Sequence, residues 1–399
     1  MVKNIDLNKV YQWLLIILAF LIPLTVFGAN LIIVIICVLW IFSGNYKTKF
    51  NQIIDNKFVL ASILFFCLHV IGLLWTEDIA WGLHIVHKMW YFLLLIPVLF
   101  TIVRKDYIAL YISSFLLAIT VTEVVSYLVW FEFINHVGHA SVRNPTPFMS
   151  HVSYNPILAF ATYIVLHELC FNKKMSNLLF TFYSFFAISM TVNMFITGGR
   201  AGQVGFFVML AILIFQVLDK QRVKSLIVIL IVIPGIFITA YQSSFLFQAR
   251  VDMALGEISR LSEKHPGSVG VRVNFAINSW HVFKKNPLIG VGTGDFPVEY
   301  NKINQIYSPA FPRTSNPHNM YTLIMVQLGL VGIFSMLLIF YYQIKISYKS
   351  SNKLIRDVGV TLPIMFLIMM LSDSYLLGHF TTLMFVFFSS FLYKDFEEN

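Results

Sequence analysis

Long apolar runs recur from one end of this 399-residue chain to the other, and few folds can accommodate them. A helix needs about 20 predominantly apolar residues to cross a bilayer, and runs of this kind follow one another here with few polar interruptions. Hydrophobic residues make up 58% of the chain and charged residues only 12%, a balance that water-soluble domains do not have. The sequence therefore predicts an all-α, polytopic membrane protein.

Twelve apolar ranges have the composition of a membrane-spanning helix. They are residues 11–27, 29–43, 58–75, 89–103, 108–130, 153–171, 178–197, 201–218, 225–241, 317–344, 358–372 and 375–393. No small-residue cleavage site follows the first run, which leads directly into the second, so we expect a retained helix rather than a signal peptide. We expect residues 1–399 to form a single integral membrane domain.

Basic residues are divided unequally between the two sets of loops that alternate along such a chain. The set that includes both termini carries Lys3, Lys9, Lys47, Lys49, Lys57, Arg104, Lys105, Lys173, Lys174, Lys220, Arg222, Lys224, Lys345, Lys349, Lys353, Arg356 and Lys394. The short loops of the other set carry only Lys88, Arg143 and Arg200. Because basic loops stay in the cytoplasm, both termini are expected inside. The net charge of +9 forms no single basic face, which argues against nucleic acid as a partner.

One outer segment, residues 241–316, is much longer than the other outer loops and has mixed polarity. Residues 245–262 and 269–285 have helical character and are separated by His265-Pro266-Gly267. We expect two amphipathic helices at the membrane surface on the periplasmic side. The glycine-rich stretch that follows, residues 286–294, is interpreted as a tight structural turn rather than a phosphate cradle, because no strand precedes it.

Asn316-Pro317-His318-Asn319 marks the point where this outer segment gives way to the tenth apolar run. Asn316 can cap a helix and Pro317 fits a first helical turn, which would place His318 at a helix N-terminus. The positive end of a helix disfavours a second positive charge, so a neutral imidazole that accepts a proton is expected there. The alternative is that His318 is only an amphipathic anchor at the membrane boundary.

Two arginines on the predicted outer side are candidates for binding an anion. Arg200 follows Gly198-Gly199 between two apolar runs, where a permanent charge is costly unless it meets an anion or water. Snorkelling to the lipid headgroups is the alternative for Arg200, and a solvated surface charge is the alternative for Arg272. A guanidinium binds phosphate through two parallel hydrogen bonds, so this pair of arginines can hold a pyrophosphate.

Other polar residues on the outer side were weighed as ligands. Arg143 and His151, before the sixth run, are expected to line the same cleft, and the intramembrane Glu123 to be protonated, paired or facing a cavity. Two groups of possible metal ligands lack a third well-spaced member, so no metal and no cofactor is expected. These groups are Glu77, Asp78, His84 and His87, and His136 with His139.

The spacing around His318 resembles a known family. His318-Asn319, nine residues, Gly329, two residues and Gly332 match the H[NSQ]-x9-G-x2-[GTY] pattern of the O-antigen ligase and bacterial O-oligosaccharyltransferase superfamily. Arg200 and Arg272 match the places of the two essential arginines of that superfamily. The second of them precedes a similar Pro287-Leu288-Ile289-Gly290-Val291-Gly292 segment. The resemblance implies a GT-C-like membrane fold with a large periplasmic loop before the tenth span.

The resemblance also implies an activity: transfer of a glycan from undecaprenyl pyrophosphate to an acceptor in the periplasm, with inversion at the anomeric carbon. It implies catalytic roles for His318, Arg200 and Arg272. Contacts to the substrate are expected from the same arginines and from Asn319, Asp373 and Arg143. The superfamily often has an acidic residue at the place of Asp373, which would orient His318 or bind a sugar hydroxyl. An ordinary polar turn explains Asp373 equally well.

Several functions remain open at this point. We favour an O-antigen ligase, a monomer in the bacterial inner membrane whose acceptor is the lipid A-core oligosaccharide. An O-antigen polymerase uses the same donor and a second lipid-linked repeat as acceptor, and a protein O-oligosaccharyltransferase is the third candidate. A transporter or flippase would place its informative polar residues at mid-membrane, whereas here they gather at one face.

Overall fold

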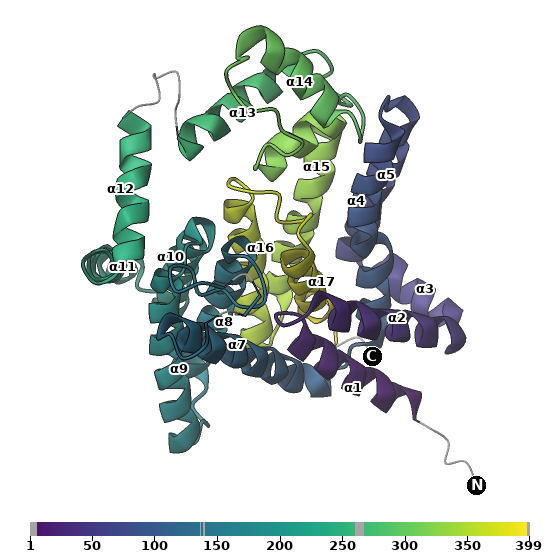
Figure 1. Ribbon diagram of the computed structural model, residues 1–399. Helices are drawn as coiled ribbons and strands as arrows, with labels where there is room; N and C mark the ends of the chain where they lie inside the picture. Colours follow the sequence, from purple (N-terminus) through teal and green to yellow (C-terminus); the bar gives the residue numbers. More distant parts are fainter. Residues whose placement is uncertain (1–5, 136, 139, 260–266, 397–399) are drawn as a thin grey trace. The chain divides into compact units, whose positions relative to one another are not determined.

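The computed structural model describes residues 6–135, 137–138, 140–259 and 267–396 (Figure 1). Within these ranges every regular element is a helix, and β-pairing is limited to one isolated bridge between Ser141 and Asn144. The chain is an all-helical, multi-span membrane protein, so the expected fold class is confirmed.

A helix lies over each apolar range that the sequence predicts to span the membrane. These helices are α1 (Leu7–Leu21), α2 (Val26–Phe42), α4 (Lys57–Ile71), α5 (Ile79–Trp90) continued by η2 (Tyr91–Leu95) and α6 (Ile96–Ile102), α7 (Ile108–Trp130), α8 (His151–Phe171), α9 (Asn177–Ile196), α10 (Arg200–Leu218), α11 (Arg222–Ser243), α15 (Met320–Lys349), α16 (Lys353–Met369) and α17 (His379–Leu392). The remaining helical elements are α3 (Tyr46–Asp55), η1 (Gly72–Trp75), η3 (Lys105–Tyr107), α12 (Phe245–Ser259), α13 (Ser268–Phe283) and α14 (Phe296–Tyr307).

Seven helical runs in the described chain are long and apolar enough to cross a membrane. The number rises to eight if α2 and α3, which are bent by 116° at the break between them, count as one span. Shorter apolar helices such as α1 and α17, with 15 and 14 residues, fall below the length of a typical span. The count of twelve spans therefore stays a prediction.

The chain divides into two compact units. Unit 1 contains Met1–Ser43, Ile102–Asp252 and Ser350–Met365. Unit 2 contains Gly44–Thr101, Met253–Lys349 and Phe366–Asn399. Each unit assembles segments that are distant in sequence. The expectation of a single domain over residues 1–399 stays a prediction.

In unit 1, α8 and α10 approach each other so closely that only glycine fits at their contact. A Cβ atom on Gly202 would lie 2.3 Å from the backbone carbon of Asn155, and one on Gly199 would lie 2.5 Å from the His151 carbonyl oxygen. Because real Cβ atoms do not approach other atoms this closely, the glycines set the distance between the two helices. This packing fixes the N-terminal end of α10, where Arg200 lies.

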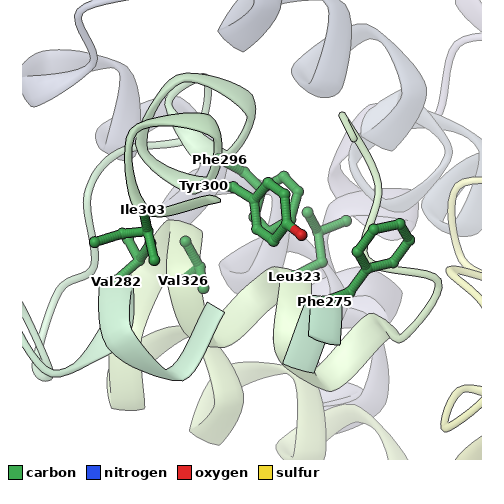
Figure 2. Packing of buried hydrophobic residues seen from close by; sticks show 7 residues of the cluster. All are labelled: Phe275, Val282, Phe296, Tyr300, Ile303, Leu323 and Val326. Atoms are coloured by element: carbon green, nitrogen blue, oxygen red, sulfur yellow. The ribbon is translucent and has the colours of Figure 1, made fainter. Parts of the chain in front are cut away.

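In unit 2, the outer segment forms a packed layer on α15. The side chains of Phe275 and Val282 on α13, Phe296, Tyr300 and Ile303 on α14, and Leu323 and Val326 on α15 form one buried cluster (Figure 2). Asn278 on α13 also donates hydrogen bonds to Asn304 Oδ1 on α14 at 3.1 Å and to Ser308 Oγ at 2.7 Å. The segment is therefore folded protein rather than an open loop.

The boundaries of this outer segment differ in part from the expectation. α13 agrees with the expected helix over residues 269–285, whereas α14 was not predicted, because its polar sequence lacks a long apolar face. The expected first helix reached residue 262, and residues 260–262 lie outside the described residues, as do His265 and Pro266. The assignment of residues 241–316 to the periplasm stays a prediction.

The glycine-rich stretch is inserted into a break in α15. At Gly329 the backbone has φ 63° and ψ −155°, so the helical hydrogen bonds across it are lost. The Val326 and Gln327 carbonyls instead accept from the amides of Val291 and Gly292, at 2.9 and 3.0 Å. The amides of Leu330 and Val331 donate to the Pro287 and Leu288 carbonyls, at 2.9 and 3.2 Å. We call this interlocking of residues 287–292 with residues 326–331 the clasp.

Candidate active site

His318 lies just before α15, not inside its first turn. α15 begins at Met320, and the Asn319 side chain caps it by accepting a hydrogen bond from the Thr322 amide at 3.0 Å. The expectation that Asn316 caps the helix and that Pro317 occupies its first turn is wrong. His318 itself has φ 51°, a left-handed conformation that is uncommon for a residue with a side chain. This turn, rather than the helix, sets the direction of the imidazole.

A set of hydrogen bonds ties this turn to the loop between α16 and α17. Asn316 Oδ1 accepts from the His318 amide and from Ser374 Oγ, both at 2.9 Å. Asn319 Nδ2 donates to the Leu371 carbonyl at 3.1 Å, and the Met320 amide donates to the Met370 carbonyl at 2.9 Å. The Asn319 amide group is thus engaged at both ends, and its expected contact with substrate stays a prediction.

The loop that is held in this way carries Asp373. Its Oδ1 lies 3.3 Å from His318 Nδ1. Burial of the Asp373 carboxyl raises its pKa. Hydrogen bonds from His318 and the Ser374 amide and the charges of His318 and Arg272 more than offset that effect, so the pKa is lowered overall. Asp373 is therefore an anion at neutral pH.

α13 supplies the remaining neighbours of His318. The Phe275 ring stacks on the imidazole with centroids 6.3 Å apart and an angle of 22° between the planes. Arg272 lies one turn earlier on the same helix, on the same side as Phe275, and its side chain is exposed. The structure thus brings His318, Asp373 and Arg272 together within unit 2, and their expected catalytic and binding roles stay predictions.

This arrangement suits proton transfer. A carboxylate beside Nδ1 holds the proton of a neutral imidazole on that nitrogen and leaves Nε2 as the acceptor. The His318 side chain is 42% exposed, so a substrate hydroxyl can reach it, whereas the Asp373 side chain is only 21% exposed. The arginine adds a positive charge that an anionic group can meet.

Arg200 belongs to unit 1, where it is the first residue of α10 and follows the Gly198-Gly199 turn. Asn144 braces this turn, because its Oδ1 accepts from the Gly198 amide at 3.0 Å. The Asn144 amide nitrogen lies 3.1 Å from His151 Nδ1, at the start of α8. His151, which was expected only as a cleft residue, is therefore part of the Arg200 cluster.

Arg250 is a further member of this cluster that was not predicted as a site residue. A Cβ atom on Gly198 would lie 3.5 Å from a terminal nitrogen of the Arg250 guanidinium, so that group lies directly over the turn. The pKa of His151 is lowered first by burial and then by the positive charges of Arg250 and Arg200. We call Asn144, His151, Gly198, Arg200 and Arg250 the guanidinium cluster. No local pattern identified Arg250, because α12 meets the 198–199 turn only through the tertiary fold.

An apolar cavity of about 1170 Å³ lies in the same unit. Residues of α9, α11 and the start of α12 line it, together with Trp130 and Arg143. Arg143 lines this cavity, whereas His151 is not among its lining residues, so the expectation that both line the cleft of the site stays a prediction. Elsewhere in unit 1, one oxygen of the buried Glu123 carboxyl group accepts a hydrogen bond from the Ser189 hydroxyl.

No three His, Cys, Asp or Glu side chains among the described residues converge as metal ligands. His136 and His139, which were weighed as one such group, lie outside those residues. The expectation that the protein needs no metal stays an expectation.

Residues 185–337 match the model of a protein family described as O-Antigen ligase (Wzy_C). The match includes Arg200, Arg250, Arg272 and His318, whereas Asp373 lies beyond it.

Two relatives are similar over a larger part of the chain. An uncharacterized protein of Haemophilus influenzae is 26% identical over 315 residues, which cover 75% of this chain and 74% of the relative. The teichuronic acid biosynthesis protein TuaE of Bacillus subtilis is 22% identical over 327 residues, which cover 76% of this chain and 65% of the relative, just under two thirds of its length. Together, the motif around His318 and the family match show that this multi-span membrane protein carries an O-antigen ligase (Wzy_C) family domain.

Proposed function

We propose that this protein is an O-antigen ligase. It transfers O-antigen polysaccharide from undecaprenyl pyrophosphate to the lipid A-core oligosaccharide at the periplasmic face of the bacterial inner membrane. The observation that carries this proposal is the pair of His318, which belongs to the family's motif, and Asp373, 3.3 Å apart and with Arg272 close by. His318 supplies the base, Asp373 the carboxylate that orients the base, and Arg272 a cation for the leaving anion.

In the proposed reaction, a hydroxyl group of the acceptor sugar attacks the anomeric carbon of the donor. His318 Nε2 takes the hydroxyl proton, while Asp373 stabilises the resulting imidazolium through Nδ1. The bond between the anomeric carbon and the pyrophosphate oxygen breaks, and the electron pair leaves with the pyrophosphate. Arg272 binds that anion and stabilises its charge as it leaves, and the resemblance to the superfamily implies the same role for Arg200. Direct displacement inverts the anomeric centre, and the residues named need no cofactor for this step.

A polymerase is the second candidate, and the similarity to TuaE favours keeping it. The name of that relative refers to teichuronic acid biosynthesis, not to lipopolysaccharide. The chemistry at His318 is the same for both candidates. They differ only in whether the attacking hydroxyl belongs to a lipid A-core sugar or to a second lipid-linked repeat.

Reconstitution of the full chain separates the two functions. The purified protein receives the lipid-linked glycan alone in one reaction, and the same glycan with lipid A-core in the other. A ligase forms product only in the second reaction, with the glycan attached to the core. Longer lipid-linked glycan in the first reaction would identify a polymerase instead, and no product in either reaction would contradict glycan transfer.

A deletion strain gives an independent measurement. Loss of a ligase leaves bare core on the lipopolysaccharide while lipid-linked polymer accumulates. Loss of a polymerase leaves core that carries a single repeat. The second pattern would contradict the ligase assignment.

A further inference from the structure

The geometry points to a polyprenyl diphosphate site inside unit 1, in which Arg250 joins Arg200 at the diphosphate and the apolar cavity holds the polyprenyl chain. Only the identity of the ligand rests on the proposed function. The site itself is argued from residues of unit 1, and Arg250 is the new member.

The cavity has the size and lining expected for a long apolar chain. Its volume of about 1170 Å³ exceeds the range of about 300–1,000 Å³ that is typical of pockets for small molecules. Most of its lining is aliphatic or aromatic, with Val192, Phe195, Val232 and Ile236 among the members. A sugar would leave its hydroxyl groups unpaired against such walls, whereas a hydrocarbon chain would not.

The guanidinium cluster has the composition expected for a phosphate site. Arg250 is half-buried and, within the described residues, forms no ion pair with a carboxylate. The guanidinium donors of Arg250 therefore remain available to an anion. Arg200, directly after the Gly198-Gly199 turn, supplies a second guanidinium. The pKa of His151 is lowered by burial and further by the charges of both arginines. Two guanidiniums around one turn match the two phosphates of a diphosphate.

The cavity and the cluster are continuous. Arg143 lines the cavity, and the next residue, Asn144, binds the Gly198 amide. Ile196 also lines the cavity, two residues before Gly198. Phe245 and Leu246, at the start of α12, line it as well, and Arg250 follows about one turn later on the same helix. A lipid with its chain in the cavity therefore has its headgroup at the guanidinium cluster.

The charge of the cluster decides between this occupant and an ordinary phospholipid. The headgroup of a phospholipid such as phosphatidylglycerol carries one phosphate, which a single guanidinium fork satisfies. Arg200 and Arg250 at the turn, with Arg143 at the cavity, supply three positive charges. Such an excess of positive charge is matched better by a diphosphate.

Binding of a glycan-free polyprenyl diphosphate to the full-length protein in phosphatidylcholine nanodiscs tests the inference. Arg250→Gln should weaken binding by about 10–100-fold, the usual loss for hydrogen bonds to a charged group. The same variant should bind the matching polyprenol, which lacks phosphate, as the wild type does. Arg222, the exposed first residue of α11, does not line the cavity, so Arg222→Gln is the matched control and should leave both affinities unchanged.

The chain-binding part has its own pair of variants. Gly235 lines the cavity, and a Cβ atom added there meets nothing within 4 Å, so Gly235→Trp fills the space without a clash at the backbone. This variant should weaken binding of both the diphosphate and the polyprenol at least about tenfold. Gly256 on α12 has equally open surroundings but does not line the cavity, and Gly256→Trp should have no effect.

Three results would overturn the inference: wild-type affinity in Arg250→Gln, wild-type affinity in Gly235→Trp, or displacement of the probe by phosphatidylglycerol at equal concentration. The binding measurement needs no turnover and is therefore separate from the proposed function. A protein that binds the probe through Arg250 but transfers no glycan would remove the ligase assignment and leave this site in place. Glycan transfer together with unchanged probe binding in Arg250→Gln and Gly235→Trp would remove this site and leave the proposed function in place.

Discussion

His151 in unit 1 and His318 in unit 2 have neighbours of opposite charge. Burial lowers the pKa of His151, and the positive charges of two guanidiniums lower it further. A carboxylate lies 3.3 Å from His318 Nδ1. The positive charges beside His151 repel a protonated ring, whereas the neighbour of His318 is a carboxylate. The same residue type is therefore suited to different work: His151 belongs to a cluster that attracts anions, and His318 to a pair that can take up a proton during a reaction.

The largest expected effect tests the proton-transfer side of this comparison. His318→Ala should reduce single-turnover glycan transfer by about 10²–10⁴-fold, the usual contribution of a general base, while donor binding is retained. His281→Ala is the matched control, because His281 lies in the same unit and stacks on Tyr307 at 4.7 Å. Equal transfer by the two variants at equal protein level would remove the base assignment.

Asp373→Asn should have a smaller effect than His318→Ala. The amide keeps the shape of the side chain but no longer holds the proton on His318 Nδ1 by charge, so we expect a fall in kcat of about 10–100-fold with little change in KM. Asp106→Asn, at an exposed carboxylate paired with Arg104, is the control. A fall in donor affinity with unchanged kcat would show that Asp373 binds substrate rather than orienting His318.

A substitution inside the clasp should lower the stability of unit 2 more than the same substitution at a glycine with open surroundings. Gly329→Ala places a methyl group 2.4 Å from the Leu288 carbonyl, at a positive φ. Gly44→Ala introduces the same unfavourable φ, but nothing lies within 4 Å. Thermal unfolding in detergent should therefore show Gly329→Ala to be less stable than Gly44→Ala by about 1–3 kcal/mol, the usual cost of overpacking. Equal unfolding temperatures would contradict the described clasp.

The smallest expected effect concerns pH and tests the anion-binding side of the comparison. Because the folded-state pKa of His151 is lowered, the unfolded chain binds more protons than the folded protein once the pH falls below the ordinary value of 6.5. Stability should therefore decrease from pH 7.5 to pH 5.5, and the decrease should be smaller in His151→Gln. The decrease in stability should also be smaller in Arg250→Gln, which removes one of the two guanidiniums. An unchanged pH dependence in both variants would contradict the described neighbours of His151.

The sequence predicted most helices of this fold because long apolar runs carry their own signal. The ranges for α7, α9 and α10 agree with the structure to within about one residue at each end. α14 was missed because Phe296–Tyr307 is polar and owes its place to the cluster with α13 and α15. The clasp could not be predicted either, because its hydrogen bonds join backbone groups 35 or 43 residues apart in the sequence.

The candidate site was predicted in part for a similar reason. His318, Arg272 and Asp373 were named through a resemblance in spacing, and the structure shows them as neighbours. The start of α15 was placed three residues too early, because Asn316 and Asn319 are equally good caps and the positive φ of His318 leaves no trace in the sequence. Arg250 was missed because its contact with Gly198 spans about fifty residues.

The most direct test of the proposed base combines His318→Ala and Asp373→Asn in one double variant. If Asp373 acts only through His318, then Asp373→Asn should cost nothing further once His318 is already Ala. Single-turnover transfer should therefore be equal in His318→Ala and in the double variant, although Asp373→Asn alone is about 10–100-fold slower than wild type. A double variant slower than His318→Ala by that same factor would mean that the two residues act independently, and would contradict the proposed base and its orienting carboxylate.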